Sequence, residues 1–575
     1  MTQMADETAK EPRASGPDAL ATYRAIAAEL TAPGAPFAIV QPGLAATRRM
    51  MGTHSSFYDI IEQSCAQNAD FTLLDFEGDR RSYGKVDDDS RRIAAALRDV
   101  FGIAKGDVVG LVMRNCPHWF STFFAIQRIG AVAALLNSRN KGPDIAAAAQ
   151  DVGARLIVAD ERCAGRLEGK TGTPVIGPDV LDTYRAGYAP DPADTRAAED
   201  EPAMVLFTSG TTGRAKGATI SHRNLCTCAR QLAYMNELGL TIAARNRGIP
   251  LDVIKQHTPR HAPLLIVPMF HISGITQMIT TLQDGGLLAG MRRWDPANAM
   301  DLIERAKVTQ VSGPSLVMAD LLALPRAKER MASVSSLVVS GQASPIALTE
   351  RMRRDFPRAS QAAGWGMTEL TGTAASCSGA VFAEHPGKVG VPLPLAEIAI
   401  RAPDGSDRPV GEVGEIAVRG PTVMTGYWGL PEANEASFDG EWFLTGDLGM
   451  FDGSGLLSIV DRAKDMVISA GENIYCAEVE RVLAMIEDHQ EVALFGVADE
   501  RLGERAIAAM VFAPDCPEGP GLDAIRAHAS AHLADYKVPT EIVFDLGPLP
   551  RNSTGKVDKA ALRKRYEARA RTPAA

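Results

Sequence analysis

At 575 residues the chain is too long for a single hydrophobic core, and about two to four compact domains are expected. Hydrophobic residues make up 46% of it and charged residues 23%, which is ordinary globular composition. The formal net charge of −10 argues against an extended nucleic-acid-binding surface, but it is compatible with a local basic pocket for phosphates.

Targeting and redox features favour a cytoplasmic location. The N-terminal segment is polar and has no apolar signal core, and no apolar run is long enough to cross a membrane. The eight cysteines are scattered, and Cys226 and Cys228 lack the second cysteine or histidine pair that a zinc site needs. We therefore expect reduced thiols and a cytoplasmic protein without a transmembrane segment.

Strands and helices alternate after the N-terminal extension. Residues 1–18 are polar, charged and contain Pro and Gly, and they are expected to be disordered. The next recognisable elements are a helix over 87–100, a strand over 108–113, a helix over 119–125, and strands over 131–136 and 155–159. This alternation indicates crossover units on a largely parallel sheet and an α/β fold class.

A run of small hydroxyl and glycine residues follows a short buried strand over 203–206. In such a turn, missing Cβ atoms let backbone N–H groups point at one concavity, while hydroxyls add donors and a lysine adds positive charge. The spacing is not that of a Walker loop, because Arg214 and Ala215 precede the lysine and no Ser or Thr follows it. The predicted phosphate-binding residues are Thr208, Ser209, Gly210, Thr211, Thr212, Gly213 and Lys216.

The segment behind this loop is less regular. A helix is expected to open there, with Ser221 or Asn224 as its N-cap. Residues 240–261 indicate an irregular excursion at the surface or a lid. The apolar run 264–271 predicts a buried strand that ends at His271, and spacing alone favours a satisfied strand-end histidine there.

A second glycine-rich stretch surrounds an indole. A strand over 337–340 runs into Gly341-Gln342-Ala343, and Gly364-Trp365-Gly366-Met367-Thr368-Glu369 follows soon afterwards. Glycines beside the indole would leave a flat face open for stacking, with a hydroxyl and a carboxylate next to it. A stacked base, a hydroxyl on a phosphate and a carboxylate on Mg²⁺ form a coherent set, whereas the tryptophan alone favours a structural role in a turn.

The pattern changes in the last third of the chain. Residues 412–451 read as short strands with tight turns, more like a small barrel, and Asp447 ends one of these strands. The charge run 461–465 lies between apolar strands and is a candidate domain boundary. The rest predicts a separate α+β unit of about 110 residues, which ends in a polar loop containing Lys556.

Together these stretches resemble the acyl-adenylate-forming superfamily of acyl-CoA synthetases, adenylation domains and luciferases. The resemblance covers nearly the whole chain from about residue 50 and rests on ordered motifs within 208–217, 364–369, 445–447, 461–474 and 550–556. It implies a ligase that uses ATP, Mg²⁺ and coenzyme A. A carboxylate attacks the α-phosphorus of ATP to give an acyl-adenylate and pyrophosphate, and coenzyme A then displaces AMP to give a thioester.

The resemblance also implies roles for individual residues. The 208–217 loop would hold the β- and γ-phosphates, Thr368 the α-phosphate, and Glu369 with Thr208 the Mg²⁺. Lys556 would contact the substrate carboxylate and the α-phosphate, and His271 would lie beside the acid. The residues implied around the nucleoside are Gly341, Gln342, Ala343, Trp365, Gly366 and Met367 for adenine, and Asp447 and Arg462 for the ribose hydroxyls.

The implied architecture is a large adenylation domain followed by a small mobile domain. The expected boundaries are 19–463 for a domain of crossover α/β sheets plus the barrel-like subdomain, and 464–575 for the α+β domain. Rotation about Lys464 would withdraw Lys556 after the first step and bring the loop around Gly471 over the pantetheine tunnel.

Two positions depart from the family pattern. Ala215 and Cys476 each stand where proline is common, and neither change removes a chemical group.

The acid itself is only coarsely predicted. The small and apolar walls expected near His271 and Gly341 favour a medium- or long-chain fatty acid or another hydrophobic acid. An aryl acid, or a carrier-protein thiol in place of free coenzyme A, remains as an alternative. The expected partners are therefore small molecules rather than nucleic acid, with homodimerisation as a family-level possibility.

Overall fold

The structure is a computed structural model that describes most of the chain. The described residues are 18–41, 48–188, 195–208, 215–339, 346–470, 472–487, 489–499, 501–512, 519–552 and 556–570. The expected disordered extension lies outside them except for Asp18, whose carboxylate caps the first helix, α1 (Ala19–Thr31).

The first of two large sheets contains seven strands. Neighbours from β9 to β8 are all parallel, and β10 and β20 add an antiparallel edge. Its order is β20 (Gly426–Tyr427), β10 (Lys216–Ser221), β9 (Pro202–Thr208), β6 (Val132–Leu135), β5 (Val108–Val112), β7 (Leu156–Ala159) and β8 (Val175–Ile176). The predicted parallel crossover sheet is confirmed.

The second large sheet has nine strands, with a parallel centre and antiparallel edges. Its order is β17 (Val391–Pro392), β16 (Gly372–Ser378), β15 (Ser360–Met367), β14 (Ser336–Val339), β13 (Gln310–Gly313), β11 (Pro263–Leu265), β12 (Leu288–Gly290), β3 (Thr72–Phe76) and β4 (Asp79–Ser82). A two-stranded ribbon, β1 (Ile39–Val40) with β2 (Arg49–Met50), comes before the first strand of this sheet in the sequence.

Helices cover both faces of the large sheets, which explains the continuous apolar runs of their strands. One core cluster joins the two sheets through side chains of α2, α3, α4, α8 and α10, while α5 and α6 cover the outer face of the first sheet and α11 to α14 that of the second. The helices are α2 (Phe57–Gln67), α3 (Tyr83–Asp99), α4 (Pro117–Arg128), α5 (Gly142–Asp151), α6 (Glu161–Leu167), α7 (Pro178–Gly187), α8 (His222–Arg247), α9 (Leu251–His257), α10 (Ile272–Asp284), α11 (Pro296–Ala306), α12 (Ser315–Ala323), α13 (Ala327–Arg330), α14 (Ile346–Asp355), α15 (Gly379–Glu384) and α16 (Pro431–Ser437).

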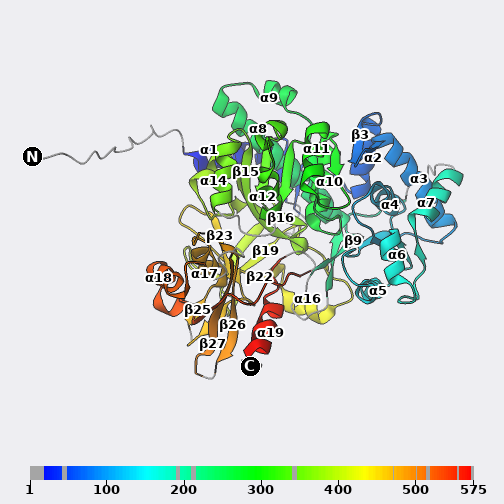
Figure 1. The fold of residues 1–575 in the computed structure, drawn as a ribbon. Helices are drawn as coiled ribbons and strands as arrows, with labels where there is room; N and C mark the ends of the chain where they lie inside the picture. The colour runs from blue at the N-terminus through cyan, green and yellow to red at the C-terminus, as the bar shows by residue number, and fades with distance from the viewer. Residues whose placement is uncertain are drawn as a thin grey trace, which may run out of the picture.

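Three predictions for residues 216–271 were wrong in detail. Residues 216–221 form β10 before the helix begins, although Ser221 is the N-cap of α8 as predicted. The supposed irregular excursion over 240–261 is mostly helical, because α8 continues to Arg247 and α9 follows at the top of Figure 1. The strand expected over 264–271 is only the three-residue β11, since the apolar residues after Leu265 lie in the loop before α10.

A smaller antiparallel sheet follows the two large ones. It contains β18 (Glu397–Arg401), β19 (Gly414–Arg419), β22 (Trp442–Phe451), β21 (Phe438–Asp439) and β23 (Leu457–Arg462). These short antiparallel strands follow the barrel-like pattern expected from the sequence, although among them β18 pairs only with β19, so the sheet stays open.

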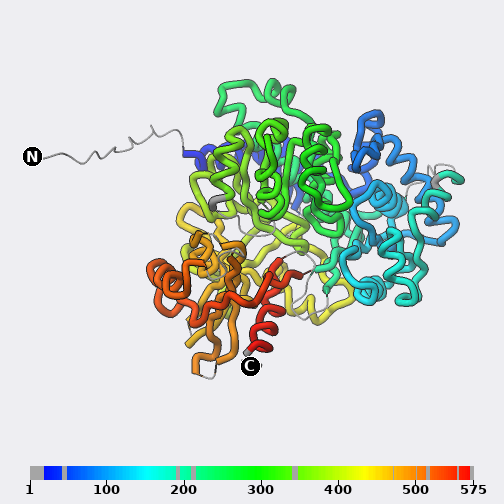
Figure 2. Tube along the Cα trace, viewed as in Figure 1, coloured from blue at the N-terminus to red at the C-terminus, as the bar shows by residue number. Residues whose placement is uncertain are grey.

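The C-terminal unit has its own sheet and core. Its elements are β24 (Val467–Ser469), β25 (Glu472–Ile474), α17 (Cys476–Leu483), β26 (His489–Asp499), β27 (Gly503–Phe512), α18 (Leu522–His532), β28 (Glu541–Val543) and α19 (Lys559–Ala570). Two core clusters in this unit contain only residues from Val467 onward. Figures 1 and 2 show it as a compact orange and red body below the large sheets.

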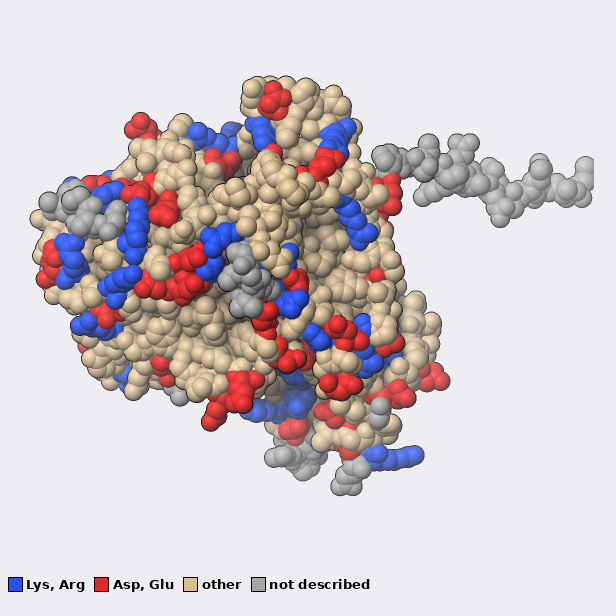
Figure 3. All heavy atoms as spheres, turned by 180° about the vertical axis from the view of Figure 1, so that it is seen from behind, with Lys and Arg blue, Asp and Glu red and all other residues tan. Residues whose placement is uncertain are grey.

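None of the helices in the described ranges is long and apolar enough to span a bilayer. On the face seen in Figure 3, basic and acidic side chains alternate, without an extended field of one sign.

Candidate active site

Asp447 lies where three strands meet. Trp365 Nε1 of β15 donates a hydrogen bond to Asp447 Oδ2 at 2.8 Å, and Arg462 Nε of β23 lies 3.1 Å from Asp447 Oδ1. The register of β22 and β23 pairs Asp447 directly with Arg462. Asp447 had been expected at the end of a strand, but it lies within β22. Each oxygen of its buried carboxylate is thus held by a neighbouring side chain.

Trp365 has different surroundings from those expected. It lies in β15 rather than in a turn, and it is only 7% exposed, so its indole does not offer the open stacking face that the sequence suggested. The neighbouring Gly366 is required by packing, because a Cβ there would lie 1.9 Å from the carbonyl oxygen of Gly372 on β16. In this structure the indole orients Asp447.

Thr368 and Glu369 begin a short 3₁₀ turn, η2 (Thr368–Leu370), directly after β15. Glu369 Oε1 accepts a hydrogen bond from the Tyr427 hydroxyl at 3.0 Å. Burial raises the pKa of the Glu369 carboxyl, while hydrogen bonds from Tyr427 and Thr208 and the charge of Arg462 oppose this rise. The turn therefore presents a partly buried carboxylate that a cation would stabilise.

The predicted phosphate loop connects two antiparallel strands. Thr208 ends β9 and pairs with Lys216 at the start of β10, and the Thr208 hydroxyl lies 3.4 Å from the Lys216 carbonyl oxygen. Lys216 Nζ lies 4.8 Å from the ring centre of Tyr427. The other predicted members of the loop, Ser209 to Gly213, lie outside the described residues, as do Gly341, Gln342, Ala343 and Gly471.

His271 occupies the N-cap position of α10 rather than the end of a strand. Its ring packs against Phe270, with 4.6 Å between ring centres. Burial, followed by the charges of Arg139 and Lys556, lowers the pKa of His271 to about 4. The imidazole is therefore neutral near pH 7.

Lys556 comes from the C-terminal unit. Desolvation and then the charge of Arg462 lower the pKa of Lys556, while Asp447 opposes this effect and Lys464 adds to it, although the side chain stays exposed to solvent. These interactions place its ammonium within electrostatic reach of Asp447 and His271. The structure thus brings together predicted residues separated by almost 300 positions.

The strand before Lys464 is tied to the C-terminal unit. Asp461 Oδ1 accepts from the Arg462 N–H at 2.8 Å, and Asp461 Oδ2 accepts from the Cys476 N–H. The Cys476 thiol donates to the Asp465 carbonyl oxygen at 2.9 Å. Proline at position 476 would lack the N–H, so this departure from the family pattern supplies a contact.

Tyr427 was missed by the sequence reasoning. It contacts both Glu369 and Lys216, but it belongs to the two-residue strand β20, which has no periodicity of its own. The only local signal is Gly426, whose φ of 138° needs glycine.

The residues present fit a magnesium ion that arrives with a nucleotide. No group of three or more His, Cys, Asp or Glu side chains within the described ranges could hold a resident metal. Mg²⁺ typically binds through one or two carboxylates together with substrate phosphates. The partly buried Glu369 carboxylate, hydrogen-bonded by Thr208, suits that arrangement.

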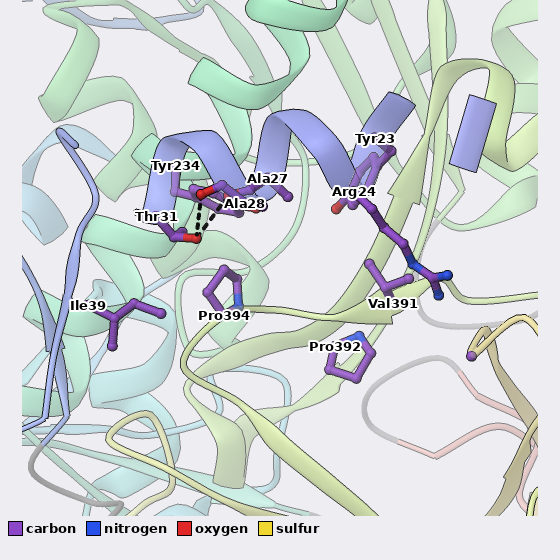
Figure 4. Close-up of a pocket in the computed structure, with 11 residues that line it drawn as sticks. Tyr23, Arg24, Ala27, Ala28, Thr31, Ile39, Tyr234, Val391, Pro392 and Pro394 are labelled. Atoms are coloured by element: carbon purple, nitrogen blue, oxygen red, sulfur yellow. Dashed lines mark hydrogen bonds between the residues drawn. The ribbon is translucent and has the colours of Figure 1, made fainter. Parts of the chain in front are cut away.

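A separate pocket of about 410 Å³ lies between α1 and the β17 region (Figure 4). Its walls are mostly apolar, and Arg24 instead reaches toward the Ser454 carbonyl oxygen. None of the candidate site residues lines it, so it is not part of the site.

A large domain of crossover sheets followed by a small C-terminal unit is the fold of adenylate-forming enzymes. Residues 61–428 match the family described as AMP-binding enzyme, and residues 478–556 match the AMP-binding enzyme C-terminal domain. The chain belongs to the AMP-binding enzyme family.

Its relatives are acid–CoA ligases. Long-chain-fatty-acid–CoA ligase FadD13 of Mycobacterium tuberculosis is 31% identical over 85% of this chain and 94% of its own length. Feruloyl-CoA synthase of Amycolatopsis is 32% identical over 86% and 96%. The structure of o-succinylbenzoate CoA synthetase (MenE) from Bacillus subtilis with ATP and magnesium has a TM-score of 0.73, with 28% identity over 88% and 99%. This chain is an ATP-dependent acid–CoA ligase that uses ATP, Mg²⁺ and coenzyme A.

Proposed function

We propose that this ligase activates a carboxylic acid with a bulky apolar portion, such as a medium- or long-chain fatty acid, and transfers it to coenzyme A. The observation that carries the proposal is that Lys556 lies within electrostatic reach of Asp447, Arg462 and His271. The start of α10, directly after His271, supplies the apolar Ile272 and the small Gly274, with no acidic group. Named relatives act on a long-chain fatty acid and on ferulate, both of which carry apolar bulk.

In the first step the acid oxygen forms a bond to the α-phosphorus of ATP as the bond to pyrophosphate breaks. Attack by an anion on a triphosphate requires positive charge and oriented donors. Lys556 would contact the carboxylate and the α-phosphate, and Thr368 would donate to that phosphate. The loop from Thr208 to Lys216 would hold the β- and γ-phosphates. Asp447 and Arg462 would bind the ribose hydroxyls.

Bound Mg²⁺ would neutralise developing phosphate charge, and Glu369 with Thr208 would hold it. The neutral His271 would line the acid site without attracting a second carboxylate. In the second step the thiol sulfur of coenzyme A attacks the acyl carbon and AMP leaves. A hinge at Lys464, with domains over 19–463 and 464–575, would withdraw Lys556 and bring the loop at Gly471 to the thiol.

A specific observation favours an aryl acid as the second candidate. Gln231 on α8 is 2% exposed and Gln277 on α10 is 7% exposed, and each has a buried amide atom without a hydrogen-bond partner among the described residues. The two helices are joined where Gln283 Nε2 donates to the Ala229 carbonyl oxygen at 3.0 Å. A hydroxyl or methoxy group on an aromatic acid would pair with such an amide.

Pyrophosphate release with fatty, aryl and dicarboxylic acids, each with and without coenzyme A, tests both candidates. Turnover with hydrophobic fatty acids and a thioester product supports the proposal. Preference for hydroxyaryl acids supports the second candidate, and acyl-AMP accumulation in the presence of coenzyme A would indicate a carrier-protein thiol as acceptor. The cytoplasmic location, a role in lipid metabolism and homodimerisation stay predictions.

A further inference from the structure

Tyr427 lies between two charged groups of the site. Its hydroxyl donates to Glu369 Oε1 at 3.0 Å, and Lys216 Nζ lies 4.8 Å from the centre of its ring. Burial and then the Glu369 carboxylate raise the pKa of Tyr427, so the hydroxyl stays protonated and acts as a donor. Tyr427 thus contacts an anion through its hydroxyl and a cation through its ring.

Backbone contacts fix this position. The Tyr427 N–H donates to Asn434 Oδ1 at 2.6 Å, and Asn434 Nδ2 donates to the Tyr427 carbonyl oxygen at 3.1 Å. Residue 427 pairs with Ala218 of β10, two residues beyond Lys216. On the other side, the Met424 N–H donates to the Glu369 carbonyl oxygen at 2.8 Å. The ring therefore lies on a segment bonded to both partner elements before any ligand binds.

We propose that Tyr427 is a positioning residue for MgATP. Its hydroxyl holds one oxygen of Glu369 so that the other faces the metal, and its ring holds the Lys216 ammonium toward the β- and γ-phosphates. One side chain thereby sets the distance between the metal and phosphate contacts, which reduces the ordering needed when the nucleotide binds. This inference rests on the proposed roles of Glu369 and Lys216.

The test separates the hydroxyl from the ring. Tyr427→Phe removes only the hydroxyl, and Tyr427→Leu also removes the aromatic face. The measurement is acid-dependent ATP–pyrophosphate exchange as a function of Mg²⁺ and of ATP. Loss of a hydrogen bond to a charged group predicts that Tyr427→Phe needs about five- to tenfold more Mg²⁺ for half-maximal rate. Its KM for ATP at saturating Mg²⁺ should stay within about twofold, whereas Tyr427→Leu should raise both values.

Tyr566→Phe is the matched control, because the Tyr566 hydroxyl donates to Glu541 Oε2 at 2.7 Å within the C-terminal unit. It should leave the Mg²⁺ requirement unchanged. The inference is overturned if Tyr427→Phe has the melting temperature of the wild type and needs the same Mg²⁺ concentration for half-maximal exchange. This variant decides the question even if Tyr427→Leu does not fold. Absence of acid-dependent exchange in the wild type would instead overturn the proposed function on which the inference rests.

Discussion

Asp447 owes its position to side chains from strands that are distant in sequence. The indole of Trp365 and the guanidinium of Arg462 approach different oxygens of its carboxylate, at 2.8 and 3.1 Å. Both groups also shield it, since Asp447 is only 6% exposed. Hydrogen bonds to a buried charge are costly to remove, because the charge then loses solvation that nothing replaces. A change at Trp365 should therefore affect both stability and nucleotide binding.

We predict that Trp365→Phe lowers the free energy of unfolding by about 1–3 kcal/mol and raises the KM for ATP severalfold. The phenyl ring keeps most of the apolar volume but cannot donate to Asp447. Urea denaturation and pyrophosphate release at varied ATP measure the two effects.

Trp294→Phe is the control for this prediction, because Trp294 Nε1 donates to Asp320 Oδ2 at 2.9 Å outside the site. It should lower stability without changing the KM for ATP. Equal KM values for Trp365→Phe and the wild type would contradict the role given to the indole.

His222 gives a prediction for pH. It is fully buried, and its Nδ1 accepts a hydrogen bond from the Phe57 N–H at 3.1 Å. Burial lowers the pKa of His222 to about 4 from the model-peptide value of 6.5. Between these values the unfolded chain binds a proton that the folded chain does not, so stability falls as pH falls from 6.5 toward 4. Each such proton contributes about 1.4 kcal/mol per pH unit at most.

We therefore expect His222→Gln to be less stable than the wild type but to lose less unfolding free energy between pH 6.5 and 5. Its slope against pH should be smaller by the uptake of nearly one proton. Urea titrations at several pH values give the slope. A slope equal to that of the wild type would mean that His222 does not titrate on unfolding.

At the scale of elements, the start of α8 links the first sheet to the part of the candidate site that contains Glu369. Ser221 and Asn224 form a capping box. The Asn224 amide also donates to the carbonyl oxygens of Pro421 and Val423, at 2.8 and 2.9 Å. The N–H of the next residue, Met424, donates a hydrogen bond to the Glu369 carbonyl oxygen. One asparagine thus completes the capping box of a helix and holds the segment that leads to Tyr427.

We predict that Asn224→Ala lowers the unfolding free energy by about 2–3 kcal/mol, because it removes the acceptor of the Ser221 N–H in the capping box and leaves two carbonyl groups without this donor. It should also raise the Mg²⁺ requirement. Ser82→Ala, which removes only the N-cap contact of α3 to the Lys85 N–H, should cost about 1 kcal/mol and leave Mg²⁺ use unchanged. Urea denaturation and Mg²⁺ titration compare them, and an unaltered Mg²⁺ requirement in Asn224→Ala contradicts the link.

Prediction from sequence succeeded where burial and conformation coincide. The strands β5, β6 and β7 are buried on both faces, so their apolar runs matched the strands to within about two residues. The run 264–271 failed because its later residues are buried in a loop, and hydrophobicity records burial rather than backbone conformation. The end of α8 was missed because a solvent-exposed helical turn needs no apolar periodicity.

The same distinction applies to the site. Asp447, Glu369 and Lys556 lie in motifs that a sequence comparison recognises, so their convergence could be expected. Tyr427 could not be found in this way, because its contacts depend on the pairing of β20 with β10, whose residues are about 200 positions apart. The burial of Trp365 likewise follows from how β16 approaches Gly366, which local sequence does not specify.

For the whole molecule, the C-terminal unit combines an independent core with a few polar contacts to the large domain. Its core clusters use only its own residues, while Asp461 accepts the Cys476 N–H across the connection near Lys464. A body with its own core can rotate without unfolding when such contacts exchange. Lys556 lies on this body, so its approach to Asp447 and Arg462 depends on the position of the whole unit.

We predict that Lys556→Ala lowers acid-dependent ATP–pyrophosphate exchange by about 10²- to 10³-fold, the range for loss of one charged or oxyanion-stabilising donor. Thioester formation from supplied acyl-adenylate and coenzyme A should stay within about threefold of wild type, because the proposed domain rotation would withdraw Lys556 in that step. Lys564→Ala, which removes the same charge from an exposed position on α19, should leave both rates unchanged. If exchange in Lys556→Ala continues at the wild-type rate, Lys556 does not act in adenylation. If adenylation and thioester formation both slow down, Lys556 is needed in both steps and is not withdrawn between them.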